Sequence, residues 1–170
     1  MNSGERSAGI VIGKVTAVQD PERQGRIQVN YPWLSGPEKR WVSVAAPMAG
    51  GDRGMFFMPE IDDEVLLAFD HGHLDHPFVI GFLWNPQQPP PSQDERQRMI
   101  RSRNGHTIRF VDSTPTGGNQ GALIIQDANG NVVTMTNGRV VIHSRGVLQL
   151  LADGDVHIGT RLVRKIGPPI

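Results

Sequence analysis

The sequence contains no cysteine, which excludes disulfide bonds and thiolate metal ligands and leaves the redox compartment open. No long stretch has helical periodicity, so we expect almost no helix. No run reaches the roughly 20 apolar residues of a membrane-spanning helix, and the N-terminal residues lack the apolar core of a signal peptide. We therefore expect the protein to be made in the cytosol.

The chain also has no net charge, because 17 Lys and Arg residues balance 17 Asp and Glu residues. Such a chain has no global field that would attract nucleic acid or an anionic membrane. Glycine and proline are frequent, with 20 and 13 residues among the 170. This composition favours an all-β chain rich in turns, with one or two small cores.

Four glycines near the C-terminus recur every eight residues, at Gly130, Gly138, Gly146 and Gly154. The residues between them alternate with a period of two, which is typical of β-strands. We expect each glycine to supply a positive-φ corner between two strands. The second and fourth residues after each glycine are predicted to face inward: Val132, Thr134, Val140, Ile142, Leu148, Leu150, Val156 and Ile158.

A single ribbon of such strands would leave its backbone edges unpaired. Short repeats bury a continuous core only when they are stacked. We therefore predict an intertwined oligomer in which several chains form one β-helical prism. The alternative is an ordinary antiparallel meander with tight turns.

The N-terminal half holds five strand-like runs, at residues 9–18, 26–31, 41–45, 64–69 and 78–84. Turn signals separate them at the spacing of a closed barrel such as the OB-fold, although a sandwich remains an alternative. A proline-rich and then charged stretch, 85–98, follows and is predicted to be an extended linker. After it, 99–111 and 122–126 are expected to be strands, with a loop at 112–121.

Several motifs, in this order, resemble the OB-fold of phage baseplate spike proteins and of the VgrG proteins of type VI secretion. They are GIVIGKVTAVQDPERQGRIQVNYPW, WVSVAAPMAGGDRGMFFMPEIDDEVLLAFDHG and HPFVIGFLWN. RSRNGHTIRFVDS and the octads resemble the β-helical needle that follows in that family. Each motif is weak alone, but their collinear order makes coincidence implausible.

The resemblance implies an OB-fold collar at 1–84, a linker at 85–98, a trimeric β-helical spike at 99–160 and a tip segment at 161–170. It implies a structural, non-enzymatic role without a cofactor, as the membrane-piercing central spike of a contractile injection system. Its partners would be two further copies of the chain, tube, hub and baseplate proteins, and transiently a target membrane. The chain would be assembled into a phage tail or a secreted injection particle.

The tip of the needle is expected to lack a metal. Relatives with a metal-bound point carry a His-x-His pair there, whereas this chain has only His157. The resemblance instead implies a separate PAAR-type tip protein, for which the candidate contacts are Leu162, Val163, Ile166 and Ile170.

The motif HGHLDH, at 71–76, is the one feature that suggests an enzyme. Its histidines and aspartate fit the zinc-ligand signature of metallo-β-lactamase-like hydrolases, and zinc catalysis needs about three such ligands. That fold, however, continues into a helix after the motif, whereas here Pro77 and a strand follow. A polar hairpin loop is the alternative, and we favour it.

Nucleic-acid binding is the remaining alternative, since OB-folds often bind single strands through aromatic platforms and a basic groove. Trp33, Trp41 and Trp84 lie at predicted strand ends, where packing explains them. The basic cluster of Arg96, Arg98, Arg101 and Arg103 has acidic neighbours. We therefore expect no nucleic-acid partner.

Overall fold

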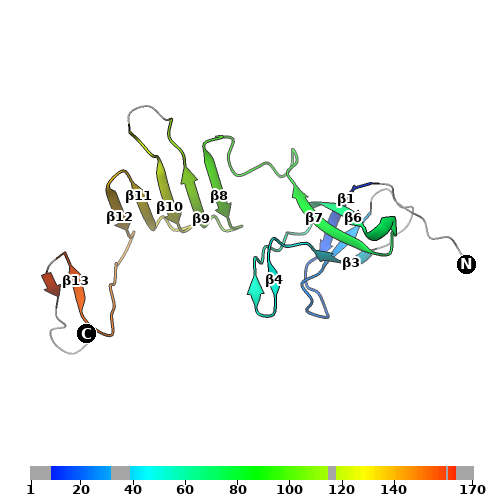
Figure 1. The fold of residues 1–170 in the computed structure, drawn as a ribbon, viewed down its shortest axis with the longest axis horizontal. Helices are drawn as coiled ribbons and strands as arrows, with labels where there is room; N and C mark the ends of the chain where they lie inside the picture. Colours follow the sequence, from blue (N-terminus) through cyan, green and yellow to red (C-terminus); the bar gives the residue numbers. More distant parts are fainter. Residues whose placement is uncertain (1–8, 32–38, 115–117, 160, 164–170) are drawn as a thin grey trace, which may run out of the picture. The chain divides into compact units, whose positions relative to one another are not determined.

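The structure is a computed structural model that describes residues 9–31, 39–114, 118–159 and 161–163 (Figure 1). The chain forms two compact units, residues 1–90 and residues 91–170, and each is described by itself. The boundary between them falls inside the proline-rich stretch 85–98.

The N-terminal unit is built around a closed five-stranded barrel. Its strands are β1 (Val11–Ala17), β2 (Ile27–Asn30), β3 (Lys39–Val44), β6 (Glu64–Phe69) and β7 (Pro77–Leu83). Their order around the barrel is β1-β2-β3-β7-β6, and only the β3–β7 pair is parallel. Each strand coincides with one of the five predicted runs, so the predicted barrel is confirmed.

Alternation along these strands sends one set of small aliphatic side chains into the barrel. The fully buried core consists of Val15, Ile27, Val29, Tyr31, Val42, Val65, Leu67 and Val79. Burying an aliphatic side chain of this size contributes about 1.5–3 kcal/mol. Gly13 on β1 is required by close packing, since a Cβ there would lie 2.5 Å from Val29 Cγ1 and 2.7 Å from Leu67 Cδ1.

Two short elements interrupt the barrel strands. The hairpin of β4 (Ala49–Gly50) and β5 (Arg53–Gly54) lies between β3 and β6 in the sequence. A 3-10 turn, η1 (Asp70–Gly72), joins β6 to β7. Among the described residues no helix has the length and apolar character needed to cross a membrane.

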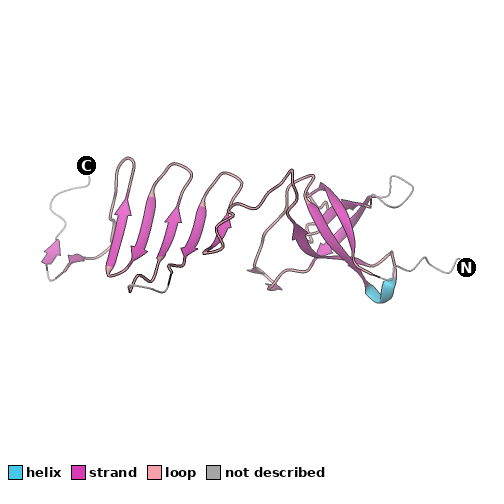
Figure 2. Ribbon diagram, turned by 90° about the horizontal axis from the view of Figure 1, so that it is seen from above, coloured by secondary structure: helices cyan, strands magenta, loops and turns pink. Residues whose placement is uncertain are grey.

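The C-terminal unit is a five-stranded antiparallel sheet in which each strand pairs with the one before it (Figure 2). Its strands are β8 (Gln97–Arg101), β9 (Thr107–Val111), β10 (Ala122–Gln126), β11 (Val132–Thr136) and β12 (Arg139–His143). A separate two-stranded sheet follows, formed by β13 (Val156–Ile158) and β14 (Arg161–Val163).

This arrangement is all-β, as predicted, but the single chain forms a meander and not a β-helix. The short connections 102–106, 127–131 and 137–138 bring consecutive strands back beside one another, and antiparallel pairs need no longer connection than this. The predicted β-helical needle is therefore not seen in the single chain.

Candidate functional site

One face of the C-terminal sheet is almost entirely apolar. Because residues that pair across strands share a face, the register aligns two rows. The first row is Ile100, Ile108, Ile125, Val133 and Ile142. The second row is Arg98, Phe110, Leu123, Met135 and Val140. We call these ten residues the apolar sheet face.

Among the described residues, all side chains of this face are exposed or half-buried. Exposed fractions are 49% for Ile100, 51% for Phe110, 44% for Ile125, 64% for Val140 and 54% for Ile142. The opposite face carries many polar groups, among them Thr107, Arg109, Gln126, Thr134, Arg139 and His143. A contiguous exposed apolar patch of this kind marks an interaction surface.

The predicted inward set does not share one face of this sheet. Val140 and Ile142 lie on the apolar sheet face, whereas Val132 and Thr134 lie on the opposite face, paired with His143 and Val141. The physical reason is the two-residue turn 137–138, which joins Thr136 to Arg139. With a two-residue turn, each residue pairs across the strands with one that is an odd number of positions away in the sequence. Two residues eight positions apart, such as Val132 and Val140, therefore lie on opposite faces of the sheet.

The remaining predicted core residues lie beyond β12. Leu148 and Leu150 are in no strand and are 52% and 62% exposed. Val156 and Ile158 belong to β13. Their contacts with other chains stay a prediction.

Two of the four repeat glycines adopt the predicted corner. Gly130 has φ 88° and Gly138 has φ 69°, and each lies in a turn between paired strands. Gly146 and Gly154 do not have positive φ, so the prediction of a left-handed corner is wrong there. The reason is that both lie in 144–155, where no strand pairing requires the chain to reverse tightly.

Of the four candidate tip contacts, Leu162 and Val163 lie in β14. Ile166 and Ile170 lie outside the described residues.

Polar side chains tie the turns of the C-terminal sheet together. The Asp127 carboxylate accepts hydrogen bonds from the main-chain N–H of Asn129 and Asn131 and from the Asn131 side chain, at 2.9, 2.8 and 2.6 Å. The Asn131 side-chain oxygen in turn accepts from Arg145 N at 2.8 Å. These bonds, led by the one from the Asn131 side chain, lower the pKa of Asp127.

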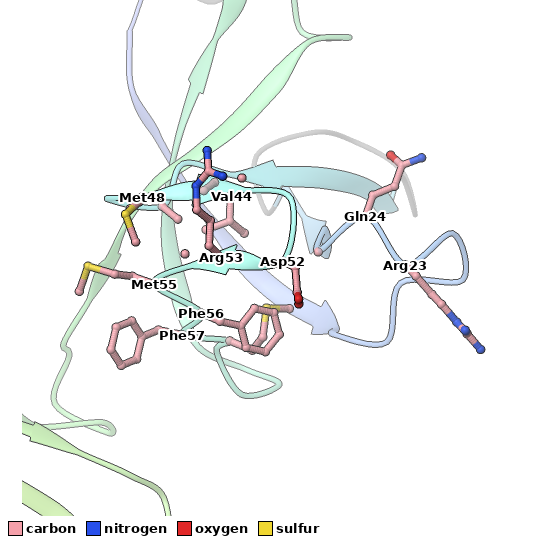
Figure 3. Close-up of a pocket in the computed structure, with 15 residues that line it drawn as sticks. Arg23, Gln24, Val44, Met48, Asp52, Arg53, Met55, Phe56 and Phe57 are labelled. Atoms are coloured by element: carbon pink, nitrogen blue, oxygen red, sulfur yellow. The ribbon is translucent and has the colours of Figure 1, made fainter.

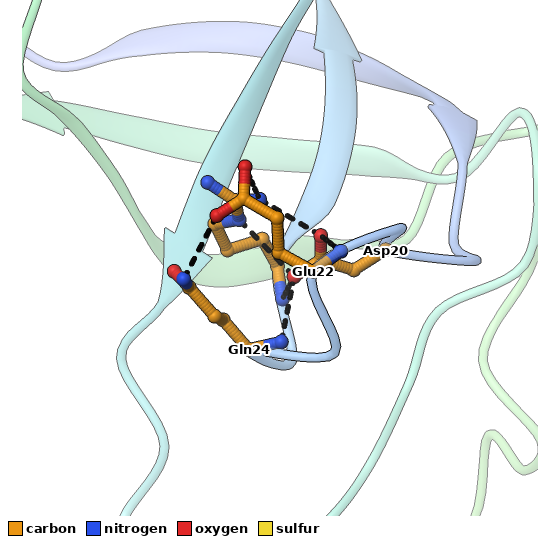
Figure 4. Close-up of polar contacts among 4 residues, drawn as sticks. Asp20, Glu22 and Gln24 are labelled. Atoms are coloured by element: carbon orange, nitrogen blue, oxygen red, sulfur yellow. Dashed lines mark hydrogen bonds and ion pairs between the residues drawn. The ribbon is translucent and has the colours of Figure 1, made fainter.

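The loop between β1 and β2 is organised by one carboxylate, that of Asp20 (Figure 4). It accepts main-chain N–H bonds from Glu22, Gln24 and Arg26 at 3.1, 2.8 and 3.3 Å, and two bonds from the Arg26 guanidinium at 2.9 and 3.1 Å. The Asp20 side chain is only 4% exposed. The Arg26 side chain, and then the backbone N–H groups, hold the pKa of Asp20 well below its ordinary range. This network fixes the Asp-Pro turn and the Gly-Arg pair that the sequence contains.

The histidine motif lies in the connection between β6 and β7. His73 and His76 have ring centroids 6.3 Å apart, and Asp75 forms an ion pair with Arg40. Among the described residues no group of three or more His, Asp or Glu side chains is close enough to hold a metal ion. β7 begins at Pro77, directly after the motif. The structure therefore places the motif in a polar loop.

The aromatic candidates for nucleic-acid binding belong to the N-terminal unit and the basic ones to the C-terminal unit. Trp33 lies outside the described residues, whereas Trp41 is in β3 and Trp84 follows β7. Arg96 pairs with Asp94, and Arg98 pairs with Asp112.

A groove beside the β4–β5 hairpin is a second candidate surface, and the sequence did not indicate it (Figure 3). Apolar side chains line it at Val44, Met48, Met55, Phe56, Phe57 and Met58, and Arg23 and Arg53 lie at its rim. Its backbone is constrained, since Gly54 has φ 154° and a Cβ there would lie 2.6 Å from the Met48 carbonyl oxygen. The signal in the sequence was the cluster of Met and Phe residues beside glycine turns.

Comparison with known families agrees with the barrel. Residues 11–84 match the family of the type VI secretion system/phage-baseplate injector OB domain. This part of the chain is therefore similar to an injector OB domain. The matched residues span the five barrel strands, the β4–β5 hairpin and the Asp20 loop.

Part of the chain also aligns with curated proteins. The type VI secretion system spike protein VgrG3 of Vibrio cholerae is 33% identical over 72 residues, covering 39% of this chain and 7% of VgrG3. The spike protein VgrG1a of Pseudomonas aeruginosa is 28% identical over 75 residues, covering 41% of this chain and 12% of VgrG1a. The chain thus matches only a small part of the length of these relatives. The predicted resemblance to baseplate and VgrG-type spike proteins is confirmed.

Proposed function

We propose that the chain is a structural central spike of a contractile injection system, with the injector OB domain as its collar and the C-terminal unit as its needle. The observation that carries this proposal is an injector OB domain followed in the same chain by a β-sheet with one open apolar face. A catalytic role has no comparable support, because the relatives are spike proteins and the histidine motif lies in a loop.

The needle is proposed to form from three copies that bring their apolar sheet faces together. Of the core residues predicted from the sequence, Val140 and Ile142 remain in this proposed core. Val132 and Thr134 do not, and the other apolar residues of the apolar sheet face take their place. Packing nine apolar side chains per chain around one axis removes them from water, at about 1.5–3 kcal/mol for each Ile or Phe fully buried. The result is a three-sided prism in which each chain contributes one wall.

Residues 144–155 are proposed to pair between chains. Val147 and Leu151 are 81% and 89% exposed, yet the segment keeps the alternating apolar pattern of the strands before it. An alternating segment that belongs to no strand of its own chain is suited to pair with a strand of a neighbouring chain. This is where the intertwining predicted from the sequence would begin.

The outer partners follow from the same proposal. Hub, tube and baseplate proteins would hold the collar, and a PAAR-type protein would cap the tip segment through Leu162, Val163, Ile166 and Ile170. The assembled particle would contact a target membrane only while it pierces it. No cofactor, metal or nucleic acid is required for this mechanical role.

A pair of neighbouring substitutions tests the proposed needle. Ile142→Asp places a charge on the apolar sheet face, whereas His143→Asp places one on the opposite face, and both side chains are exposed in the single chain. We expect Ile142→Asp to convert the trimer into monomers in sedimentation equilibrium, because the charge cannot be buried unpaired. His143→Asp should remain trimeric. If both variants stay trimeric, the apolar sheet face is not the needle core.

A further inference from the structure

The face of the C-terminal sheet that lies opposite the apolar sheet face carries charge of one sign. It consists of the residues of β8–β12 that are not in the apolar sheet face, and we call it the basic sheet face. Arg101 on β8, Arg109 on β9 and Arg139 on β12 belong to it. Its residues, all of which the structure describes, include no Asp or Glu. The chain as a whole has no net charge, so the excess of positive charge is local to this surface.

The carboxylates near the sheet have other partners. The contacts are those of Asp94 with Arg96, Asp112 with Arg98, and Asp127 with Asn131, while Glu95 interacts with Arg96. Neither of these two arginines belongs to the basic sheet face. Within the part of the chain that the structure describes, Arg101, Arg109 and Arg139 have no ion pair. The positive charge of this face is therefore not neutralised within its own sheet.

Arg109 shows most directly that this face lacks an anion. It lies in the middle of β9, half-buried, and pairs in register with Met99 on one side and Ile124 on the other. Its Nε atom is buried and has no hydrogen-bond partner among the described residues. A buried donor without a partner costs stability, and such groups are rare in folded proteins. An anion bound at Arg109 would supply the missing acceptor.

The three arginines follow a diagonal across the sheet. Arg101 pairs in register with Thr107, and Arg109 with Met99, so the two arginines are diagonal neighbours about 7–8 Å apart. Arg139 lies three strands from Arg109 and two residues further along, which is about 16 Å at the usual strand and residue spacings. A linear polymer with repeated negative charges can reach all three.

Exposure on this face favours a hydrophilic polymer over a lipid bilayer or a nucleic acid. The exposed side chains are those of Arg101, Thr136, Arg139 and His143, whereas the apolar side chains of the face are half-buried. A surface that binds a bilayer inserts apolar side chains into it. Single-stranded nucleic acids are held by aromatic side chains on which bases stack, and the described residues of this face include no Phe, Tyr or Trp. Arginine, by contrast, binds phosphate through paired hydrogen bonds.

We propose that the basic sheet face binds a phosphate-bearing polysaccharide, with phosphate groups held by Arg101, Arg109 and Arg139 and sugar hydroxyl groups bound by polar neighbours such as Thr136. This inference rests on the proposed function, in which the apolar sheet faces are buried inside the needle and the basic sheet faces form its outer wall. The wall then has affinity for phosphorylated polysaccharide at the surface of a target cell.

Binding of phosphomannan to the purified full-length protein tests this inference, with unphosphorylated mannan as the neutral control polymer. Affinity is measured by isothermal titration calorimetry at about 50 and about 200 mM salt. One variant combines Arg101→Gln with Arg139→Gln and so removes the two exposed arginines of the face. The matched control combines Arg23→Gln with Arg53→Gln, which removes the same charge from two exposed arginines of the barrel unit.

We expect the natural protein to bind phosphomannan and not mannan. At about 0.7 counterion released per phosphate contact, three contacts give a log–log salt slope of about −2, or roughly a 20-fold loss of affinity between the two salt concentrations. The variant at Arg101 and Arg139 should keep one contact and a slope of about −0.7. The barrel variant should bind like the natural protein.

Several results would overturn the inference: no binding of phosphomannan, equal binding of mannan, or the same loss in both variants. Tighter binding of single-stranded DNA, or of vesicles of phosphatidylcholine and phosphatidylglycerol, would also overturn it. Sedimentation equilibrium on the same samples separates it from the proposed function. A trimer that does not bind phosphomannan overturns the inference alone, whereas a monomer that binds with the expected slope supports the binding face and contradicts the proposed needle.

Discussion

The close packing around Gly13 gives a quantitative test of the barrel core. A Cβ at residue 13 would lie 2.5 Å from Val29 Cγ1, 2.7 Å from Leu67 Cδ1 and 3.3 Å from the Asn30 carbonyl oxygen. Both side-chain neighbours are fully buried. Gly13→Ala should therefore destabilise the barrel by about 1–3 kcal/mol, as other overpacked cores show.

A second substitution should partly relieve this strain. Leu67→Ala alone removes a fully buried side chain and is expected to cost about 2–5 kcal/mol. In the double variant, the missing Leu67 methyl groups make room for the new Cβ. The two effects should then fall short of additivity by about 0.5–3 kcal/mol, the range for residues in contact.

Urea unfolding followed by tryptophan fluorescence measures these differences. All three tryptophans belong to residues 1–90, so the signal reports the barrel unit. Gly51→Ala is the matched control, because a Cβ there would meet nothing within 4 Å. A Gly13→Ala variant as stable as Gly51→Ala, or strictly additive effects in the double variant, would refute the packing described for the core.

Three further outcomes are expected. The pKa values of Asp20 and Asp127 are lowered, and the hydrogen bond from Arg96 lowers the pKa of Asp94 to about 2. These carboxylates therefore stabilise the fold at pH values above the ordinary carboxyl pKa. Urea midpoints should therefore fall as the pH drops from about 5 to 2, and Asp20→Asn should reduce this dependence; an unchanged dependence contradicts the role of the Asp20 loop. Gly54→Ala should disorder the β4–β5 hairpin, because φ 154° and the close Met48 carbonyl exclude a side chain; amide exchange at 49–54 as slow as in the natural protein would contradict this. Single-stranded DNA should show no salt-dependent binding, and a log-linear salt slope would favour the nucleic-acid alternative.

The barrel could be predicted from the sequence because its strands carry a strong local signal. In β1 the buried residues alternate with exposed ones and in β6 with half-buried ones, and turn residues bound each run. Alternation with a period of two is a local property of the chain. The element positions therefore followed from residues close together in the sequence.

The face of the C-terminal sheet could not be predicted in the same way. The octad repeat was recognised, but the face on which Val132 or Val140 lies depends on the length of the turn between them. A two-residue turn at 137–138 reverses the parity that the repeat suggests. Sequence periodicity fixes alternation within one strand, whereas the register between strands depends on the turn geometry.

The hairpin groove was missed for a different reason. In the sequence, Met55 and Phe56 look like ordinary core residues. They are exposed in the structure because β3 and β6 close the barrel around a core made of other side chains. Exposure of an apolar cluster is a tertiary property that composition does not reveal.

The molecular mass of the full-length chain in solution tests the central claim most directly. Sedimentation equilibrium should give three times the 18.7 kDa of one chain. A chain that stays at 18.7 kDa at every concentration would contradict the proposed spike, because its apolar sheet face would then remain in water.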